Sequence, residues 1–372
     1  MAKRALITGA AGLVGANLAR VLLADGARAV RGLVRATTDL RALAGLDVEL
    51  VRGDVRDPEA LERAITGCDV VYHCAAVYQL GRQGAASDAE IIDTAVRGAT
   101  NTLEAAARAG GVERVVLTSS VVAVGRSHAA DVSCDESWTW NLDGAYAYIV
   151  AKRRAEDAAL ALAAARGLTL VVVNPSGVLG PWDTRPTPTA ASVLTLLNAR
   201  VPVPFYPAGG GNMVDAEDVA RGHLLAARHG RAGERYILCG ENATYRTILG
   251  TVARFAGQAA PRLPLGPRVA WGLGAVMEAV SKLTGRPPEL TRELAEQHVG
   301  LYQYYTPAKA ARELGYAPRG LAAVLARAIL WFVRDGKLRR PEKLDREALE
   351  IAAAAVPGAG PTALSGGAYE PS

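Results

Sequence analysis

The chain has 372 residues, of which 50% are hydrophobic and 21% charged, and its formal net charge is +5. These proportions are typical of a globular protein that is large enough for one α/β domain and a smaller lobe. Because the arginines are spread along the chain, mostly on predicted helix faces, we expect a mildly basic protein that prefers anionic ligands and does not bind nucleic acid.

The spacing of cysteines and histidines argues against a disulfide framework and against a metal site. The 4 cysteines form no C-x-x-C and the 5 histidines form no H-x-x-x-H, so we expect free thiols in a reducing compartment and no metal. The chain enters its first predicted strand directly after Lys3 and Arg4, which leaves no room for a signal peptide and favours a cytoplasmic protein. The most apolar segment, 269–283, is too short for a membrane span and contains Glu278 and Lys282.

The first feature in chain order is a strand, a glycine-rich turn and a helix. Residues 5–7 read as the end of a buried strand, Gly9, Gly12 and Gly15 follow, and 16–23 have helical apolar spacing. Glycines allow the tight turn and let a pyrophosphate approach the helix N-terminus. A plain strand-to-helix turn is the alternative, but the position at the start of an alternating α/β pattern favours dinucleotide binding. The cofactor contacts expected here are Thr8, Gly9, Gly12, Leu13, Val14 and Gly15.

The end of the second predicted strand, 29–34, indicates which dinucleotide is preferred. An acidic residue at this point binds the ribose 2′-hydroxyl of NAD, whereas an arginine accommodates the 2′-phosphate of NADP. The residue here is Arg35, and the first acid, Asp39, comes later. We therefore favour NADP(H), with NAD(H) possible; the alternative is a solvated loop arginine.

Two further strands, 47–52 and 69–73, complete the first half of the predicted sheet. A helix is expected after Asp57, and His73 is interpreted as a hydrogen-bonded structural residue rather than an acid/base. The residues that follow these two strands and are expected to contact the cofactor are Asp54, Val55, Ala75 and Ala76.

The next part of the chain carries the candidate catalytic residues. A helix over 93–108 and a strand over 115–117 lead to Thr118-Ser119-Ser120, and a long Ala-rich helix is predicted over 144–166. Hydroxyls at the carboxyl end of a parallel strand face the ligand in open α/β sheets. Tyr148 and Lys152 lie four residues apart on that helix and therefore share a face.

This combination predicts acid/base chemistry at a carbonyl or alcohol. A lysine ammonium and an oxidised nicotinamide favour the phenolate of Tyr148, which can then exchange a proton with the substrate oxygen while hydride is transferred. Lys152 can also hold the nicotinamide ribose, and Ser120 can orient the substrate oxygen. Tyr-x-x-x-Lys alone is a weak signal, since it recurs at Tyr305 and Lys309, where Pro307 argues against a helix.

Beyond a sixth strand over 168–173, with Pro175 and Val178 expected at the cofactor, the composition shifts. We predict a Rossmann domain over 1–181 with a return at 213–228, a substrate lobe over 182–340, and an extended, partly disordered tail over 341–372. Helices are expected at 261–283, with a broad apolar face, and at 318–336.

With these motifs the chain resembles the extended short-chain dehydrogenase/reductases, often described as NAD-dependent epimerase/dehydratases, over roughly residues 3–338. The motifs are Thr8-Gly9-x-x-Gly12-x-x-Gly15, Gly53-Asp54, Thr118-Ser119-Ser120, Tyr148-x-x-x-Lys152, Asn174-Pro175, Gly180-Pro181, Val214-Asp215-x-x-Asp218, and Glu313-Leu314-Gly315-Tyr316-x-Pro318. The resemblance implies a doubly wound parallel sheet with a smaller C-terminal lobe. It also implies Ser120 as catalytic hydroxyl, Tyr148 as acid/base with Lys152 as its partner, and a homodimer formed through helices such as 93–108 and 144–166.

Two branches are most similar, the dihydroflavonol-reductase and 3β-hydroxysteroid-dehydrogenase-like group and the hopanoid-associated sugar epimerases. Nucleotide-sugar members usually carry an arginine just before the position of Asp215 and another at the Asn174-Pro175 site, and this chain has neither. A diphosphate needs cationic partners. We therefore expect an NADP(H)-dependent reductase or dehydrogenase of an apolar small molecule, with a peripheral membrane contact as an open alternative to free diffusion of the substrate. The alternatives are a nucleotide-sugar epimerase or dehydratase, and a non-catalytic dinucleotide sensor.

Overall fold

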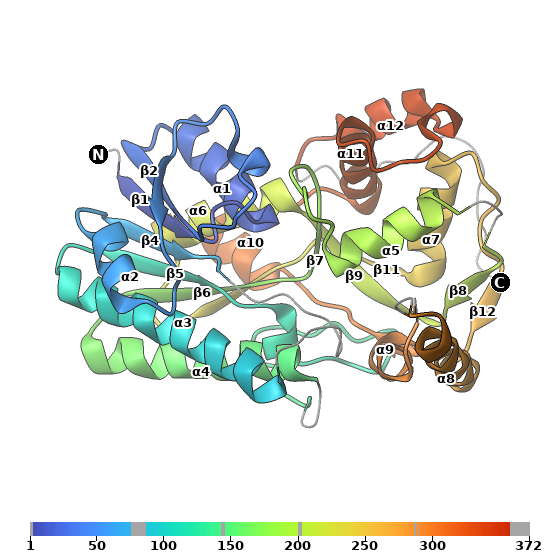
Figure 1. Cartoon of the computed structure of the whole chain (residues 1–372), viewed down its shortest axis with the longest axis horizontal. Helices are drawn as coiled ribbons and strands as arrows, with labels where there is room; N and C mark the ends of the chain where they lie inside the picture. The colour runs from blue at the N-terminus through green and yellow to red at the C-terminus, as the bar shows by residue number, and fades with distance from the viewer. Residues whose placement is uncertain are drawn as a thin grey trace.

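The computed structural model describes residues 3–75, 87–142, 146–199, 203–285, 288 and 290–357. In this part of the chain a large parallel sheet lies between two layers of helices, and a smaller sheet with its own helices lies beside it (Figure 1).

The large sheet has seven strands in the order β10-β6-β5-β4-β1-β2-β3, all paired in parallel. The order reverses between β1 and β4, and ligands of open α/β sheets bind in the crevice at the carboxyl ends of strands that flank such a reversal. The seven strands are β1 (Arg4–Thr8), β2 (Ala29–Val34), β3 (Glu49–Arg52), β4 (Val70–His73), β5 (Arg114–Thr118), β6 (Leu170–Pro175) and β10 (Arg235–Leu238).

Each face of this sheet is covered by helices whose apolar side chains form a separate core. On one face lie α1 (Leu13–Ala24), α6 (Ala216–His229) and α10 (Ala308–Leu314). On the other face lie α2 (Pro58–Ile65), α3 (Asp88–Ala109) and α4 (Ala147–Arg166) (Figure 1). Apart from the edge strand β3, the strands are mostly buried on both faces, as expected for a parallel sheet with near-continuous apolar runs.

The second sheet has β9 at its centre. β9 (Gly209–Asp215) pairs antiparallel with β11 (Glu241–Thr244) and parallel with β13 (Leu301–Tyr302) and β7 (Gly177–Leu179), while β8 (Phe205–Pro207) and β12 (Leu263–Leu265) form a separate parallel pair. The helices of this part are α5 (Pro188–Leu197), α7 (Tyr245–Phe255), α8 (Pro267–Thr284), α9 (Arg292–His298), α11 (Leu321–Arg334) and α12 (Arg346–Ala353). Three short 3₁₀ turns lie at Arg41–Leu43, Val121–Ala123 and Pro341–Lys343.

A buried charge cluster ties α11 to α6. Arg319 pairs with Asp218, and the Nε of Arg327 donates to Asp215 over 2.7 Å. Asp215 also caps α6 by accepting from the Glu217 amide. Breaking one partner of such a cluster leaves an uncompensated buried charge, so these residues hold the α11 layer in a fixed position against the large sheet.

The alternating strands and helices of the first 175 residues, and the doubly wound parallel sheet that they form, are confirmed. Several boundaries differ from the sequence predictions. The third helix starts at Asp88 instead of residue 93, because Ser87 and Glu90 form a capping box there. The return to the large sheet extends beyond 228 to include β10.

Two predictions in the last third of the chain are wrong. The segment 261–283 is not one helix, since Leu263–Leu265 pair with β8 before α8 begins. The tail from 341 is not wholly extended, because α12 buries Leu349 and Ala352 in the core formed with α7 and α11. The partial disorder predicted for this tail concerns its end, and residues 358–372 lie outside the described residues.

Candidate active site

The glycine turn joins β1 to α1 at the point where the strand order reverses. Gly9 has a positive φ of 69°, and Gly12 caps α1 after donating its amide to the Gly9 carbonyl over 3.0 Å. The first amides of a helix have no partner within the helix, and the first turn of α1 contains no acidic residue. Leu13, Val14 and Gly15 therefore present their amides at an N-terminus suited to a phosphate group.

The packing around this turn fits a dinucleotide. A Cβ on Gly9 would lie 2.9 Å from the backbone of Ala75, and one on Gly15 would lie 2.4 Å from the Gly9 carbonyl oxygen. Only glycine can fill these two positions without moving the backbone of β1 or the β4 loop. The close approach of Gly9 to Ala75 brings the ends of β1 and β4 together at the crevice where a pyrophosphate would bind.

Thr8 and His73 support this arrangement from within. Thr8 is buried, and its hydroxyl accepts from the Ala75 amide over 3.2 Å and lies 3.1 Å from His73 Nδ1. Burial lowers the pKa of His73 to about 3, with a smaller contribution from the Lys152 charge. His73 is thus a neutral, hydrogen-bonded residue, as the sequence indicated. Ala76, the remaining residue predicted here, lies outside the described residues.

Arg35 follows β2 at the same edge of the sheet and is exposed. Its neighbourhood is basic: Arg52 donates to the Arg35 carbonyl over 3.0 Å, and Arg56 holds both carboxylate oxygens of Asp54 at 3.0 Å. Hydrogen bonds from Arg56 lower the pKa of Asp54, and Arg35 contributes to the same shift. Asp54, the one acid predicted at this end of the cofactor, is therefore already paired with Arg56.

The other predicted cofactor residues line the same edge of the sheet. Val55 follows Asp54, and its carbonyl accepts from Asn101 on α3. Pro175 is the last residue of β6, and Val178 lies on β7, where the chain passes into the smaller sheet. They surround the crevice from the strands on either side of the reversal.

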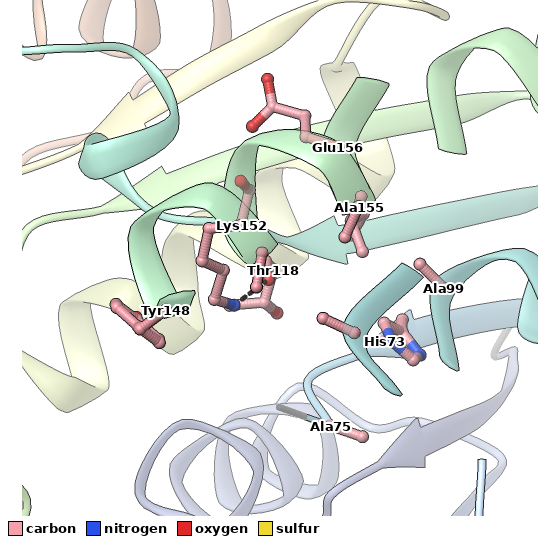
Figure 2. A pocket seen from close by; sticks show the side chains of 12 residues that line it. His73, Ala75, Ala99, Thr118, Tyr148, Lys152, Ala155 and Glu156 are labelled. Atoms are coloured by element: carbon pink, nitrogen blue, oxygen red, sulfur yellow. Dashed lines mark hydrogen bonds between the residues drawn. The ribbon is translucent and has the colours of Figure 1, made fainter. Parts of the chain in front are cut away.

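Tyr148 and Lys152 lie one turn apart on α4, as predicted. Figure 2 shows Lys152 reaching from α4 to the carboxyl end of β5, where its Nζ donates to the Thr118 carbonyl over 3.0 Å, with Tyr148 one turn away. Burial lowers the pKa of Lys152 to about 8, while the nearby Cys74 and Glu156 raise it. The ammonium form therefore still predominates at neutral pH.

The two serines after Thr118 face different surroundings. Ser119 lines the cavity that also contains Tyr148 and Lys152, and its buried Oγ has no hydrogen-bond partner among the described residues. Ser120 lies beyond the strand end, where its Oγ accepts from the Val122 amide over 3.4 Å and its carbonyl accepts from Asn174. Both serines are within the segment that connects β5 to the site.

Sequence reasoning missed two groups that hold this segment. Glu156, one turn beyond Lys152, is fully buried and pairs with Arg235 at 2.7 Å and with Asn174 at 2.9 Å; its side chain points away from Lys152 in Figure 2. His223 on α6 lies 2.8 Å from the Thr118 hydroxyl. The i, i+4, i+8 spacing of Tyr148, Lys152 and Glu156 could have revealed the first group, but nothing local indicated the second.

A polar cluster that was also missed lies where α9 meets the start of α4. Tyr146, which caps α4, has its hydroxyl 3.2 Å from His298 Nε2 at the end of α9. Arg126, six residues after Ser120, is half-buried, and burial lowers its pKa, with smaller opposing contributions from Tyr305, Tyr146 and Tyr245. The contact between Tyr146 and His298 connects α9 to the start of α4, two residues before Tyr148.

The second Tyr-x-x-x-Lys is structural. Tyr305 is buried and donates to the Gly125 carbonyl over 2.9 Å, while Lys309 lies on α10 and pairs with Glu234. Pro307 separates the two residues at the start of α10, as predicted. Among the described residues, no three His, Cys, Asp or Glu side chains come together as a metal site would require.

Known proteins resemble this chain over most of its length. A sequence model of the NAD dependent epimerase/dehydratase family matches residues 5–239. A putative dihydroflavonol 4-reductase of Synechocystis sp. is 36% identical over 350 residues, covering 91% of this chain and 97% of that protein. Sterol demethylase protein B of Methylococcus capsulatus is 34% identical over 345 residues, covering 90% of this chain and 99% of that protein.

Among solved structures, DesIV of Streptomyces venezuelae, a dTDP-glucose 4,6-dehydratase with NAD bound, is similar at a TM-score of 0.72 and 26% identity over 91% of this chain and 98% of that chain. The family match covers the glycine turn, both serines, Tyr148 and Lys152. Because the matched family consists of enzymes, the alternative of a non-catalytic dinucleotide sensor is not supported. The chain belongs to the NAD-dependent epimerase/dehydratase family and is an NAD(P)-dependent enzyme of the extended short-chain dehydrogenase/reductase type.

Proposed function

We propose that this enzyme interconverts a ketone and a secondary alcohol on a mostly apolar small molecule, with NADP(H) as an exchangeable cofactor. The observation that carries the proposal is the placement of Tyr148 and Lys152 on one face of α4, with Lys152 bonded to the carboxyl end of β5 beside the glycine crevice.

Each residue has a separate task in this scheme. The bound dinucleotide supplies or accepts hydride at the substrate carbon. Tyr148 gives its proton to the carbonyl oxygen, or takes one from the alcohol, and the Lys152 ammonium stabilises the resulting phenolate. Ser120 holds the substrate oxygen in line with Tyr148.

An apolar substrate is favoured by the side chains around Tyr148. Leu142 and Ile149 are buried against it, and Val122 and Trp140 pack on the same cluster. The Trp140 indole donates to the Val122 carbonyl over 3.0 Å, so the ring is held in one position. It can therefore form part of the apolar surroundings of a substrate bound at Tyr148. Two relatives are named for a dihydroflavonol and for a sterol, which agrees with a ring-containing apolar substrate.

The run before Asp215, which lacks the arginine of the sugar enzymes, has one polar side chain, Asn212, and that side chain bonds only within the protein. Asn212 on β9 accepts from Ser176 over 2.7 Å and from the Gly240 amide over 2.8 Å, and it donates to Asn242 over 2.7 Å and to the Gly240 carbonyl over 2.9 Å. It has no hydrogen-bonding capacity left for a diphosphate. This observation argues against a nucleotide sugar as substrate.

The test is the variant Tyr148→Phe, assayed for NADPH-dependent reduction of apolar ketones, with Tyr206→Phe on β8 as matched control. Tyr148→Phe should lose at least about a hundredfold in kcat, since general acid catalysis contributes roughly 10²–10⁴, while NADPH binding measured by fluorescence is retained. Wild-type activity in Tyr148→Phe would refute the proposal.

A second candidate is an epimerase or dehydratase acting on a nucleotide sugar. It is favoured by the likeness to the dTDP-glucose dehydratase and by a half-buried cation, Arg126, six residues after Ser120. This reading predicts protein purified with tightly held NAD and turnover of a nucleotide sugar without net consumption of NADPH.

A further inference from the structure

Large exposed hydrophobic side chains gather on one part of this molecule. They include Val269, Leu273, Val276, Val280 and Leu283 on α8, which we call the α8 stripe. Trp271 on α8, and Phe205 and Leu263, which pair across β8 and β12, extend the exposed apolar surface beyond the stripe. Clustered exposed apolar side chains mark interaction sites, whereas single ones do not.

The members of the α8 stripe form one continuous face of the helix. Its members are spaced by four, three, four and three residues, so they fall within an arc of about 80° at 3.6 residues per turn. The opposite face of α8 is already used, because Ala270 and Gly274 are buried against α9. Val269 is 65% exposed and Leu283 is 87% exposed, so the described chain leaves the stripe open.

The charged residues around the stripe indicate what kind of surface would bind it. Arg268 and Lys282 are exposed near its two ends, and Arg262 is exposed beside β12. The acid of α8, Glu278, is held by Arg292 at 2.9 Å. Apolar side chains flanked by cations are the composition of a helix that lies in the interface of an anionic bilayer.

A second copy of this chain fits the same surface less well. Antiparallel pairing of two α8 helices about Val276 would bring Arg268 of each copy near Lys282 of the other. Parallel pairing would set Arg268 opposite Arg268 and Lys282 opposite Lys282. Both arrangements place like charges together at the ends of the stripe, whereas phosphate headgroups would neutralise all of them.

The stripe is also linked to the active site. α8 packs on α9, and α9 ends at His298, which bonds Tyr146 two residues before Tyr148. In Figure 1, α8 and α9 lie together at the end of the molecule that carries β8 and β12, beyond the large sheet. A membrane in contact with α8 would therefore lie on the side of the molecule from which α9 reaches the Tyr148 site.

We propose that α8 docks the enzyme on anionic lipid surfaces, from which it takes its apolar substrate. None of the helices in the described part of the chain is long and apolar enough to cross a bilayer. The proposed contact is peripheral, with the stripe among the acyl chains and Arg262, Arg268 and Lys282 at the headgroups. This inference rests on the proposed function for the nature of the substrate, but its test does not use the substrate.

The experiment is cosedimentation of the full chain with sucrose-loaded vesicles of phosphatidylcholine, with and without phosphatidylglycerol, in the absence of cofactor and substrate. The wild type should bind the anionic vesicles. The double variant Val276→Asp/Val280→Asp should lose at least about tenfold in partition coefficient, because it places two charges in the acyl region. Ile351→Asp, at an exposed apolar position on α12, is the matched control and should bind as the wild type does.

Single changes of the cations separate lipid binding from other causes. Arg268→Gln and Lys282→Gln should each lower partition onto anionic vesicles about fivefold, with little effect on neutral ones. Absence of wild-type binding, or equal loss in Ile351→Asp, would overturn the proposal. So would a dimer in solution that the Val276→Asp/Val280→Asp variant abolishes, since the stripe would then belong to a second copy. Because vesicle binding is measured without turnover, failure of the ketone reductase assay leaves this result unaffected.

Discussion

Replacing Arg35 with Gln should selectively weaken NADPH binding. The structure places the Arg35 guanidinium at the carboxyl end of β2, beside a carboxylate, Asp54, that Arg56 already compensates. A hydrogen bond to a charged group contributes roughly 1.5–3 kcal/mol. Because Arg35 is exposed, we take the lower end, which corresponds to about a tenfold rise in the Kd for NADPH. The Kd for NADH, which lacks the 2′-phosphate, should stay within about twofold.

The assay is fluorescence titration of both cofactors at one ionic strength, since exposed charge pairs weaken with salt. The matched control is Arg28→Gln, which removes the same charge at the other end of β2, about 23 Å away over seven residues at about 3.3 Å each. Equal weakening of NADPH and NADH in Arg35→Gln, or an equal effect in Arg28→Gln, would refute the assignment of Arg35 to the 2′-phosphate.

Four further outcomes follow from other parts of the structure. Gly9→Ala should abolish dinucleotide binding, and it should lower the free energy of unfolding, measured by chemical denaturation, more than Gly45→Ala does. Both glycines have a positive φ, but only at Gly9 would the added Cβ meet backbone atoms, at 2.9 Å. Equal losses of stability in the two variants would contradict this. The kcat/KM for reduction should fall as pH rises through about 8, where Lys152 loses its proton, and this fall should disappear in Lys152→Arg. An unchanged pH profile in Lys152→Arg would show that Lys152 is not the group whose titration lowers kcat/KM. Over the same range the unfolded chain binds more protons than the folded one, so the free energy of unfolding should rise with pH relative to Lys152→Met. Leu349→Ala should lower the free energy of unfolding by roughly 2–5 kcal/mol, against a small change for the exposed Ile351→Ala, because α12 is part of the core.

The features that could be predicted from sequence are the local ones. The glycine turn, the strand ends and the one-turn spacing of Tyr148 and Lys152 each lie within a few residues, and each has a distinct chemical requirement. The argument from Pro307 against a second catalytic pair was likewise local, and the structure confirms it, because α10 begins after Pro307 and does not include Tyr305. The family resemblance and the parallel sheet followed from the same segments.

The features that were missed depend on contacts between distant segments. α12 was read as tail because its composition resembles that of the following Ala- and Gly-rich residues, and only burial against α7 and α11 makes Leu349 part of a core. His223 reaches Thr118 across 105 residues, and His298 reaches Tyr146 across 152. The apolar face of the 261–283 segment was recognised, but its spacing alone could not show that this face stays exposed.

The central claim is that the enzyme performs net hydride transfer with an exchangeable NADPH at the Tyr148 site. The most direct measurement is the stoichiometry of NADPH consumed to secondary alcohol formed, with purified enzyme and an apolar cyclic ketone, read by absorbance and by chromatography of the product. The account predicts one NADPH oxidised for each alcohol formed, and no such consumption in Tyr148→Phe. Tightly retained NAD, together with turnover of a nucleotide sugar without change in the cofactor, would contradict it.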